Sequence, residues 1–284
     1  MHHLNFGSST RVGNVRSHNE DSFRAEPELG LWIVADGMGG HKGGATASAI
    51  AADFVVEKIR AGDALENAIA GAHHAVLQAS RDGKGPEGMG TTIVALGING
   101  HACEIAWVGD CRAYLWDGAT LTQLTRDHSY VQHLVDTGVI SSSESARHPY
   151  QDILIQALGA ADIPDVNVEK ITRELYQNEQ ILLCSDGLTK ELSDKDIADV
   201  LAMDLTEQER VDFMTDAALK NGGRDNITVI LVSADPDAPV RLMSGDTQPM
   251  NMEELKTARL KPTGFPEKLR DWFKATVKVF FSTR

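Results

Sequence analysis

Four acidic residues of this sequence stand where an apolar run begins or ends, a position from which a carboxylate can do chemistry. Asp36, Asp110 and Asp186 each follow a run typical of a buried strand, and Asp225 precedes another. A buried carboxylate without a partner is costly, so each of these acids needs a cation or several hydrogen-bond donors. The neighbouring glycines are expected to leave space for that cation.

If the strands that carry these acids pair in two sheets, their carboxylates can converge at one edge of the core. Convergent carboxylates repel one another, and hard divalent cations, which prefer oxygen ligands, relieve that repulsion. The three cysteines, Cys103, Cys111 and Cys184, form no zinc pattern, and no set of His and Cys ligands competes for the site. The residue types therefore favour Mg²⁺ or Mn²⁺ over Zn²⁺.

Two such ions that share a bridging water would lower its pKa and present a nucleophile to a phosphorus centre. Arg16, in the polar run before the first of these strands, would supply the forked donor pair that holds a phosphate. Residue types and spacing alone therefore indicate a metal-assisted hydrolase, with phosphoesters as its substrates.

Structural roles are the alternative for each of these residues. The acids could be strand-end turn carboxylates that backbone amides cap. Arg16 could form an ion pair with Glu20 or Asp21, a role that can coexist with phosphate binding. His128 and His148 could contact substrate, but packing within their own segment is favoured.

Apolar periodicity predicts the elements that must position these acids. Helices are expected over residues 45–59, 64–81, 194–201 and 207–220. Strands are expected over residues 31–34, 91–98, 101–108, 112–116, 180–184 and 227–232. Asn99-Gly100 predicts a hairpin with a type I′ turn, and Gly109-Asp110-Cys111 would place an acid at a second hairpin tip.

Composition excludes several classes of protein. The chain has 284 residues, of which 42% are hydrophobic and 24% charged, and it contains no apolar run of membrane-spanning length. A net charge of −14 speaks against nucleic-acid partners. Because the start of the chain lacks the organisation of a signal peptide, we expect a cytoplasmic protein. The odd number of cysteines argues against a disulfide framework.

The chain is expected to comprise one catalytic domain and a different kind of tail. Residues 1–235 form the predicted domain, in which a polar insertion at about 125–158 is typical of a flap. Residues 236–265 contain several prolines and are typical of a linker, and 266–284 are a candidate basic amphipathic helix. That tail could pack on its own domain, remain loose, or bind a membrane surface or a partner.

Seven short motifs follow one another along the chain: residues 15–21, 35–40, 90–92, 108–112, 124–129, 184–187 and 223–226. In their order and residue identities they resemble the motifs of the bacterial, metal-dependent type 2C-like Ser/Thr protein phosphatases, over roughly residues 8–234. Asp-Gly alone is a common turn, whereas seven motifs in the family's order are a specific signal.

The resemblance implies an α+β fold, a four-layer α-β-β-α sandwich of two antiparallel sheets flanked by helices. It implies hydrolysis of phosphoserine and phosphothreonine in proteins by a metal-bridging water, which reverses Ser/Thr kinase signalling. The implied cofactors are two core ions, Mn²⁺ or Mg²⁺, with a third, weaker ion. The implied partners are phosphorylated proteins and a cognate Ser/Thr kinase, and we expect a monomer.

The resemblance also implies a ligand set for the two core ions. Asp36 would bridge both ions, and Gly37 would contribute its backbone carbonyl. Asp186 and Asp225 would complete one ion, and Glu20 would hold the other, directly or through water.

Three further roles follow from the same resemblance. Asp21 would orient metal-bound water from behind the ligands, and Arg16 would bind the substrate phosphate. Asp110 with Asp186 would form the third, weaker metal site.

The chain departs from the family pattern in places. Met38 stands where many eukaryotic relatives carry a histidine proposed as the general acid, so the leaving oxygen must gain its proton elsewhere, such as from water on the third ion. His41 is close in sequence but is interpreted as a rim residue. Cys111 replaces a more common serine, and a buried inert thiol is favoured over an oxidant-sensitive one.

A second class of function is a phosphatase-like binding module that recognises phosphoproteins, with the tail as its docking element. A pseudo-enzyme normally loses a metal ligand. None of the expected ligands is missing here, which favours an active phosphatase.

Overall fold

The computed structural model describes residues 4–39, 42–145 and 148–240. By its internal contacts the chain divides into one unit of residues 1–240 and another of residues 241–284. The linker predicted at 236–265 therefore lies largely outside the described residues, and the helix predicted at 266–284 lies wholly outside them. The predicted domain limits stay a prediction.

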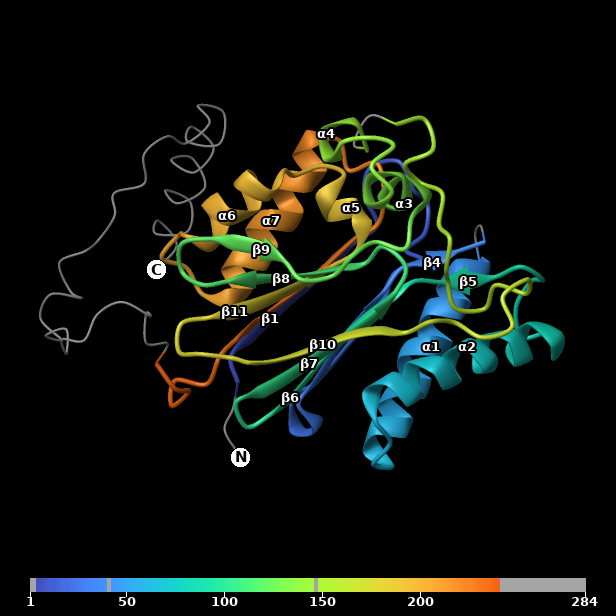
Figure 1. The fold of residues 1–284 in the computed structure, drawn as a ribbon, viewed down its shortest axis with the longest axis horizontal. Coiled ribbons are helices and arrows are strands. Elements are labelled where there is room, and N and C mark those ends of the chain that lie inside the picture. The colour runs from blue at the N-terminus through green and yellow to red at the C-terminus, as the bar shows by residue number, and fades with distance from the viewer. Residues whose placement is uncertain (1–3, 40–41, 146–147, 241–284) are drawn as a thin grey trace, which may run out of the picture. The chain divides into compact units, whose positions relative to one another are not determined.

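Two five-stranded antiparallel sheets form the centre of the described unit (Figure 1). The first sheet has the order β1 (Phe6–Arg11), β12 (Ile227–Ser233), β11 (Gln180–Cys184), β8 (Arg112–Trp116) and β9 (Leu121–Gln123). The second sheet has the order β10 (Glu169–Glu174), β7 (Ala102–Val108), β6 (Ile93–Asn99), β3 (Leu31–Ala35) and β2 (Ser22–Glu26). A small third sheet pairs β4 (Gly37–Met38) with β5 (Gly90–Thr91).

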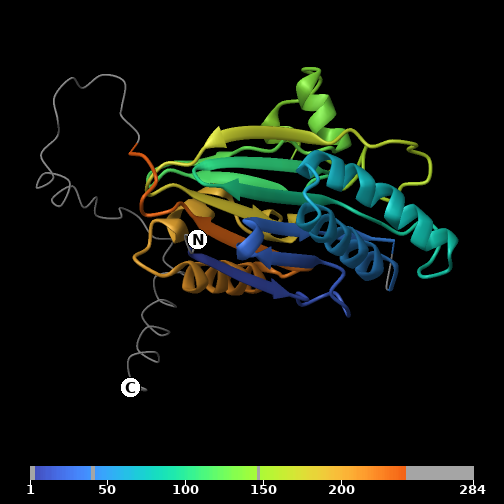
Figure 2. The same ribbon diagram turned by 90° about the horizontal axis from the view of Figure 1, so that it is seen from below.

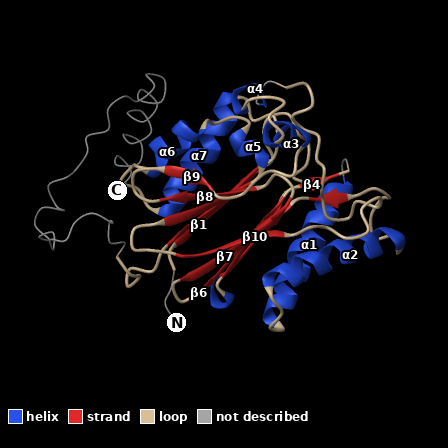
Figure 3. Ribbon diagram, in the orientation of Figure 1, coloured by secondary structure: helices blue, strands red, loops and turns tan. Residues whose placement is uncertain are grey.

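Helices cover the outer faces of both large sheets (Figures 2 and 3). On the second sheet lie α1 (Lys42–Arg60) and α2 (Leu65–Arg81), and on the first lie α6 (Asp194–Leu201) and α7 (Glu207–Asn221). Short elements complete the unit: η1 (Pro27–Leu29), α3 (Tyr130–Asp136), α4 (Ser142–Ser145) and α5 (Asp186–Thr189). The layers confirm the predicted α-β-β-α sandwich, and each helix and strand predicted within the described residues occurs within a few residues of its expected limits.

The central strand β3 shows why its sequence is apolar throughout. Leu31 and Ile33 pack under α1 and α2, whereas Trp32 and Val34 fill the space between the two sheets. Successive side chains of a strand point to opposite faces, and here both faces are covered. The strand therefore ends in the core at Ala35, and Asp36, which follows it, is partly buried and lines a cavity.

Two local predictions about connections are wrong. Strands β6 and β7 form the expected hairpin, but Asn99 pairs with Ala102, so the turn consists of Gly100 and His101, and of these two only Gly100 has a positive φ, of 62°. A type I′ turn needs positive φ at both positions. The segment Gly109-Asp110-Cys111 is no hairpin tip, because it carries the chain from β7 in the second sheet to β8 in the first.

Two of the glycines that follow the acids, Gly37 and Gly187, allow close packing of the backbone. A Cβ atom on Gly187 would overlap the carbonyl oxygen of Asn226, and one on Gly37 would overlap the carbonyl oxygen of Gly44. Backbone atoms occupy the position that a Cβ atom would take at each of these two glycines. The absence of a side chain lets the ends of strands β3 and β11 approach neighbouring segments closely.

Gly187→Ala is expected to destabilise the fold by about 1–3 kcal/mol, because the new methyl group would push the backbone at Asn226 away. Urea unfolding followed by circular dichroism measures this. Gly97→Ala is the matched control, since a Cβ there would meet its nearest neighbour, a methyl group of Leu65, at an ordinary 3.8 Å. Equal stability of the two variants would contradict the close approach at Gly187.

Candidate active site

A cavity of about 250 Å³ lies at the end of the sandwich where β3 and β11 end and β12 begins. Its lining comes from segments far apart in the sequence, and six of the lining residues are acids: Glu20, Asp36, Asp110, Asp152, Asp186 and Asp225. Arg16, Gly37 and Met38 line it as well. The structure thus brings together the convergent carboxylates that the strand-end positions predict.

Asp21 is the one predicted site residue that does not line this cavity, and it lies buried. Its Oδ2 atom accepts hydrogen bonds from the hydroxyls of Ser185, at 2.8 Å, and Thr228, at 2.7 Å. Within the described residues its Oδ1 atom has no hydrogen-bond partner, and neither has Oδ1 of Asp186. Both orphaned oxygens belong to carboxylates that a cation could satisfy.

Burial and mutual repulsion raise the pKa values of the acids. Burial raises the pKa of Asp36 well above its usual range, and the charges of Asp21 and Asp186 add to the effect. Burial, with Asp186 as the nearest repelling charge, raises the pKa of Asp110 to about 8. The pKa of Asp21 rises to about 7, again through burial, although its two hydroxyl partners oppose the shift. Without a cation, full ionisation of all these acids is therefore unfavourable.

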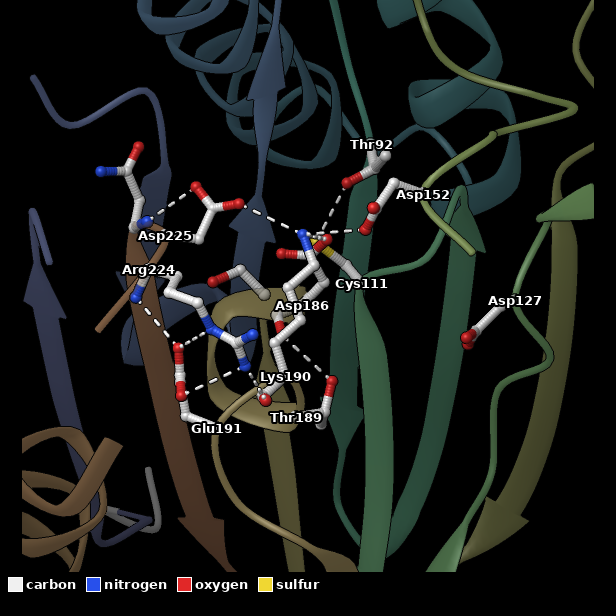
Figure 4. A network of polar contacts seen from close by, with 12 residues as sticks. Thr92, Cys111, Asp127, Asp152, Asp186, Thr189, Lys190, Glu191, Arg224 and Asp225 are labelled. Atoms are coloured by element: carbon white, nitrogen blue, oxygen red, sulfur yellow. Dashed lines mark hydrogen bonds and ion pairs between the residues drawn. The ribbon is translucent and has the colours of Figure 1, made fainter. Parts of the chain in front are cut away.

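Two basic side chains compensate part of this charge. The guanidinium group of Arg16 forms a bidentate ion pair with Asp225, with 2.8 Å between Nε and Oδ1 and 3.0 Å between Nη2 and Oδ2. The ammonium group of Lys190 lies 2.6 Å from Asp186 Oδ2 and 3.2 Å from Asp225 Oδ2 (Figure 4). Burial alone would raise the pKa of Asp225, but Arg16 and Lys190 hold it below its usual value. Among the described residues Arg16 is thus ion-paired to Asp225 and not to Glu20 or Asp21, the partners that the structural alternative named.

The donor set fits a hard divalent cation. All of the acids offer oxygen ligands, and the buried Oδ1 of Asp186 has no hydrogen-bond partner among the described residues. Burial and mutual repulsion raise the pKa values of Asp36 and Asp110, so a cation would be needed to keep them ionised. Within residues 4–39, 42–145 and 148–240, however, no three His, Cys, Asp or Glu side chains are already grouped so as to hold one ion. The assignment of metal ligands therefore stays a prediction.

Asn226 ties the site loops together. Its side-chain oxygen accepts a hydrogen bond from the backbone N–H of Glu20 at 2.8 Å, and its amide group donates to the carbonyls of Val12 and His18. The loop that carries Arg16 and Glu20 is thereby fixed to the start of β12, beside Asp225.

Two charged residues of the cavity, Lys190 and Asp152, were not predicted from the sequence. Lys190 stands four residues after Asp186, a spacing that places opposite charges side by side on a helix, and this spacing could have indicated it. Asp152 lies in the polar insertion, where nothing in the local pattern distinguishes it from other surface acids.

The insertion between β9 and β10 carries α3 and α4, and it reaches the cavity through Asp152 and Leu154. His128 is buried, and its Nδ1 atom accepts a hydrogen bond from the backbone N–H of Gly109 at 3.2 Å. His128 therefore has a packing role, but against the end of β7 rather than within its own segment as expected, and through Gly109 it supports the loop of Asp110.

Three further residues singled out in the sequence are His148, Cys111 and His41. The first two pack against neighbouring side chains. His148 lies against the rings of Tyr130 and Tyr150, with centroid distances of 6.3 and 5.7 Å. Cys111 is buried, and its sulfur lies 3.1 Å from the hydroxyl of Thr92. Burial raises the pKa of this thiol well above its usual value, in line with an inert cysteine. His41 lies outside the described residues.

Two facing antiparallel sheets between helices, with buried acids converging at one end of the sandwich, define the class of the type 2C-like protein phosphatases. A family model described as protein phosphatase 2C matches residues 10–230. The chain belongs to the protein phosphatase 2C family, as its seven motifs predict.

Bacterial relatives agree with this assignment. The chain is 36% identical, over 239 residues, to the serine/threonine phosphatase stp of Listeria monocytogenes, and the match covers 80% of this chain and 94% of the relative. The solved structure of the serine/threonine phosphatase PstP of Mycobacterium tuberculosis has a TM-score of 0.74 and 33% identity, and the match covers 82% of this chain and 99% of that chain. These relatives confirm the predicted fold and the predicted class of enzyme, a Ser/Thr protein phosphatase, rather than a binding module.

A second solved structure bears on the cofactor. The catalytic domain of PstP in complex with two manganese ions has a TM-score of 0.71 and 31% identity, and the match covers 81% of this chain and 97% of that chain. In the present structure, none of the helices in the described part of the chain is long and apolar enough to cross a membrane.

The raised pKa values predict how the stability of the metal-free protein depends on pH. A carboxyl whose pKa is raised in the folded state keeps its proton where the unfolded chain has lost it, so folding is favoured at low pH. In EDTA, the melting temperature should therefore fall as the pH rises from about 4, the usual pKa of an aspartate, to about 8, the pKa of Asp110. Calorimetry at several pH values measures this. Asp110→Asn should make the melting temperature depend less steeply on pH. An unchanged slope in this variant would contradict the raised pKa of Asp110.

Proposed function

We propose that this phosphatase hydrolyses phosphoserine and phosphothreonine in proteins with the help of divalent cations, Mn²⁺ or Mg²⁺. In this proposal two ions are held by Glu20, Asp36, the carbonyl of Gly37, Asp186 and Asp225. A third, weaker ion is held by Asp110 together with Asp186.

The observation that carries the proposal is the convergence of six acids on one cavity with too few positive charges to balance them. Phosphate esters are negatively charged, so they could not approach this cavity unless cations first reversed its charge. The catalytic domain of PstP, solved in complex with two manganese ions, supports the same number of core ions here. When bound, the ions would supply a nucleophilic water and neutralise the charge that develops on the phosphoryl group.

Arg16 is suited to hold the substrate phosphate. Its side chain is 54% exposed at the rim of the cavity, and its fork already binds the two oxygens of a carboxylate, Asp225. A phosphate presents a similar pair of acceptors. Arg16 can therefore exchange Asp225 for the substrate when an ion takes over the charge of that acid.

Two other residues bear on the transfer of protons. Asp21 is held by the hydroxyls of Ser185 and Thr228, so its carboxylate is fixed where it can orient the attacking water, which must lose a proton, from behind Asp36. Met38 lines the cavity but carries no exchangeable proton. We therefore assign protonation of the leaving serine or threonine oxygen to water in the cavity.

The wider setting also belongs to the proposal. The relatives are named serine/threonine phosphatases, which supports phosphorylated proteins as substrates here. A cognate Ser/Thr kinase, a cytoplasmic location and a monomeric state remain predictions from the sequence.

Asp36→Asn is expected to lower turnover of a phosphothreonine peptide by about a hundredfold or more, since even residues that merely support a metal ligand contribute about ten- to a hundredfold. Phosphate release with Mn²⁺, with Mg²⁺ and with EDTA measures this. Asp53→Asn is the control, because that exposed acid on α1 pairs only with Arg24 among the contacts described. Near wild-type turnover in Asp36→Asn would contradict the proposed role of Asp36 as a metal ligand.

Arg16→Ala should raise KM for the phosphopeptide while kcat changes little, if the guanidinium grips ground state and transition state alike. Arg16→Lys should recover only part of the loss, because a single ammonium cannot make the two parallel hydrogen bonds. Steady-state kinetics at saturating Mn²⁺ separates the two constants. An unchanged KM would reassign Arg16 to the structural pairing with Asp225.

A further inference from the structure

Lys190 places a positive charge among the acids that are proposed to hold a metal ion. Its ammonium group lies 2.6 Å from Asp186, 3.2 Å from Asp225 and 3.5 Å from Asp152 (Figure 4). Asp186 and Asp225 come from the two neighbouring strands β11 and β12, and Asp152 comes from the insertion that borders the cavity. One side chain therefore links both ligand-bearing loops to the insertion.

The backbone around Lys190 is firmly held, so that only its side chain is free to move. Its backbone N–H donates to the carbonyl of Asp186 at 2.8 Å, and its own carbonyl accepts from Arg224 at 3.0 Å. The next residue, Glu191, has a side chain only 2% exposed, and its carboxylate accepts from the backbone and side chain of Arg224. By contrast, the side chain of Lys190 is 29% exposed and long enough to swing.

An ammonium group and a divalent cation cannot both occupy the space between Asp186 and Asp225. The two positive charges would lie a few ångströms apart, where repulsion is strong in a partly buried site. The same carboxylate oxygens would also have to serve both. Asp152, whose side chain is 65% exposed, offers the ammonium group a partner at the edge of this space.

We propose that Lys190 is a built-in counter-ion, which holds Asp186 and Asp225 in the metal-free enzyme and must turn toward Asp152 before a divalent cation can bind them. This inference rests on the proposed function, since it takes these two acids as metal ligands. Lys190 is thus a positioning residue that lowers the affinity for the ion but stabilises the fold without it.

The test measures metal binding directly. Isothermal titration calorimetry of the metal-free protein with Mn²⁺ should give an apparent dissociation constant about tenfold lower for Lys190→Met than for the wild type, the scale on which groups around a metal site alter affinity. Lys190→Arg keeps the charge and should bind Mn²⁺ like the wild type. Lys195→Met is the matched control, because Lys195 pairs with Asp199 at the same four-residue spacing on the exposed side of α6.

Thermal unfolding provides a readout that a purely structural lysine would not give. In EDTA, Lys190→Met should melt below the wild type, because Asp186, Asp225 and Asp152 then repel one another without compensation. At saturating Mn²⁺ the difference in melting temperature between Lys190→Met and the wild type should vanish or reverse, because the ion replaces the lysine. A variant that melts below the wild type by the same amount in both conditions would overturn the proposal. If Lys190→Met does not fold in EDTA, Lys190→Gln, which keeps a hydrogen-bond donor, serves in its place.

Asp152 completes the test. Asp152→Asn should weaken Mn²⁺ binding in the wild-type background, because Lys190 loses the partner to which it withdraws, but should have little effect in the Lys190→Met background. An equal effect in both backgrounds would show that Asp152 acts on the ion without Lys190, against the proposal.

The outcomes also separate this inference from the proposed function. Absence of Mn²⁺ binding by the folded wild type would overturn the metal site itself. Binding by the wild type with unchanged affinity in Lys190→Met would overturn the role of Lys190 alone.

Discussion

Repulsion among partly buried carboxylates at one end of the sandwich is the constraint on which the rest of this structure depends. Burial and neighbouring charge raise the pKa values of Asp36, Asp110 and Asp186 together. Such an arrangement costs stability unless a cation is present. The fold must therefore hold these acids rigidly enough to prevent them from moving apart, and it must supply or recruit positive charge.

The two sheets meet the first of these requirements. Strands β3 and β11 run through the core and end one residue before Asp36 and two residues before Asp186, while Asp110 lies on the crossing from β7 in one sheet to β8 in the other. Glycines allow the strand ends to touch neighbouring backbone, and the amide of Asn226 ties the loop of Glu20 to β12. The acids are held by the framework of the domain rather than by one another.

Arg16 and Lys190 meet the second requirement in the absence of an ion, and they differ in what they can do next. Arg16 lies at the rim with a fork that matches a phosphate, so its release from Asp225 can serve substrate binding. Lys190 is a compact charge on a flexible stem, and its release leads only to Asp152. The same two side chains therefore balance the charge of the acids when no ion is bound and are released when an ion or the substrate phosphate binds.

The sequence by itself determined the helices and strands, the family, and the identity of most acids in the cavity. Apolar periodicity is local, as in β3 and α7, and the Asp-Gly motifs keep their order in the chain whatever the fold does with them. Tertiary structure decided the rest: the crossing of Gly109-Asp110-Cys111 between sheets, the turn at Gly100 and His101, the pairing of Arg16 with Asp225, and the place of Lys190 beside Asp152. Each of these depends on which distant segments lie next to each other, and a pattern read along one stretch of chain carries no information about its neighbours in space.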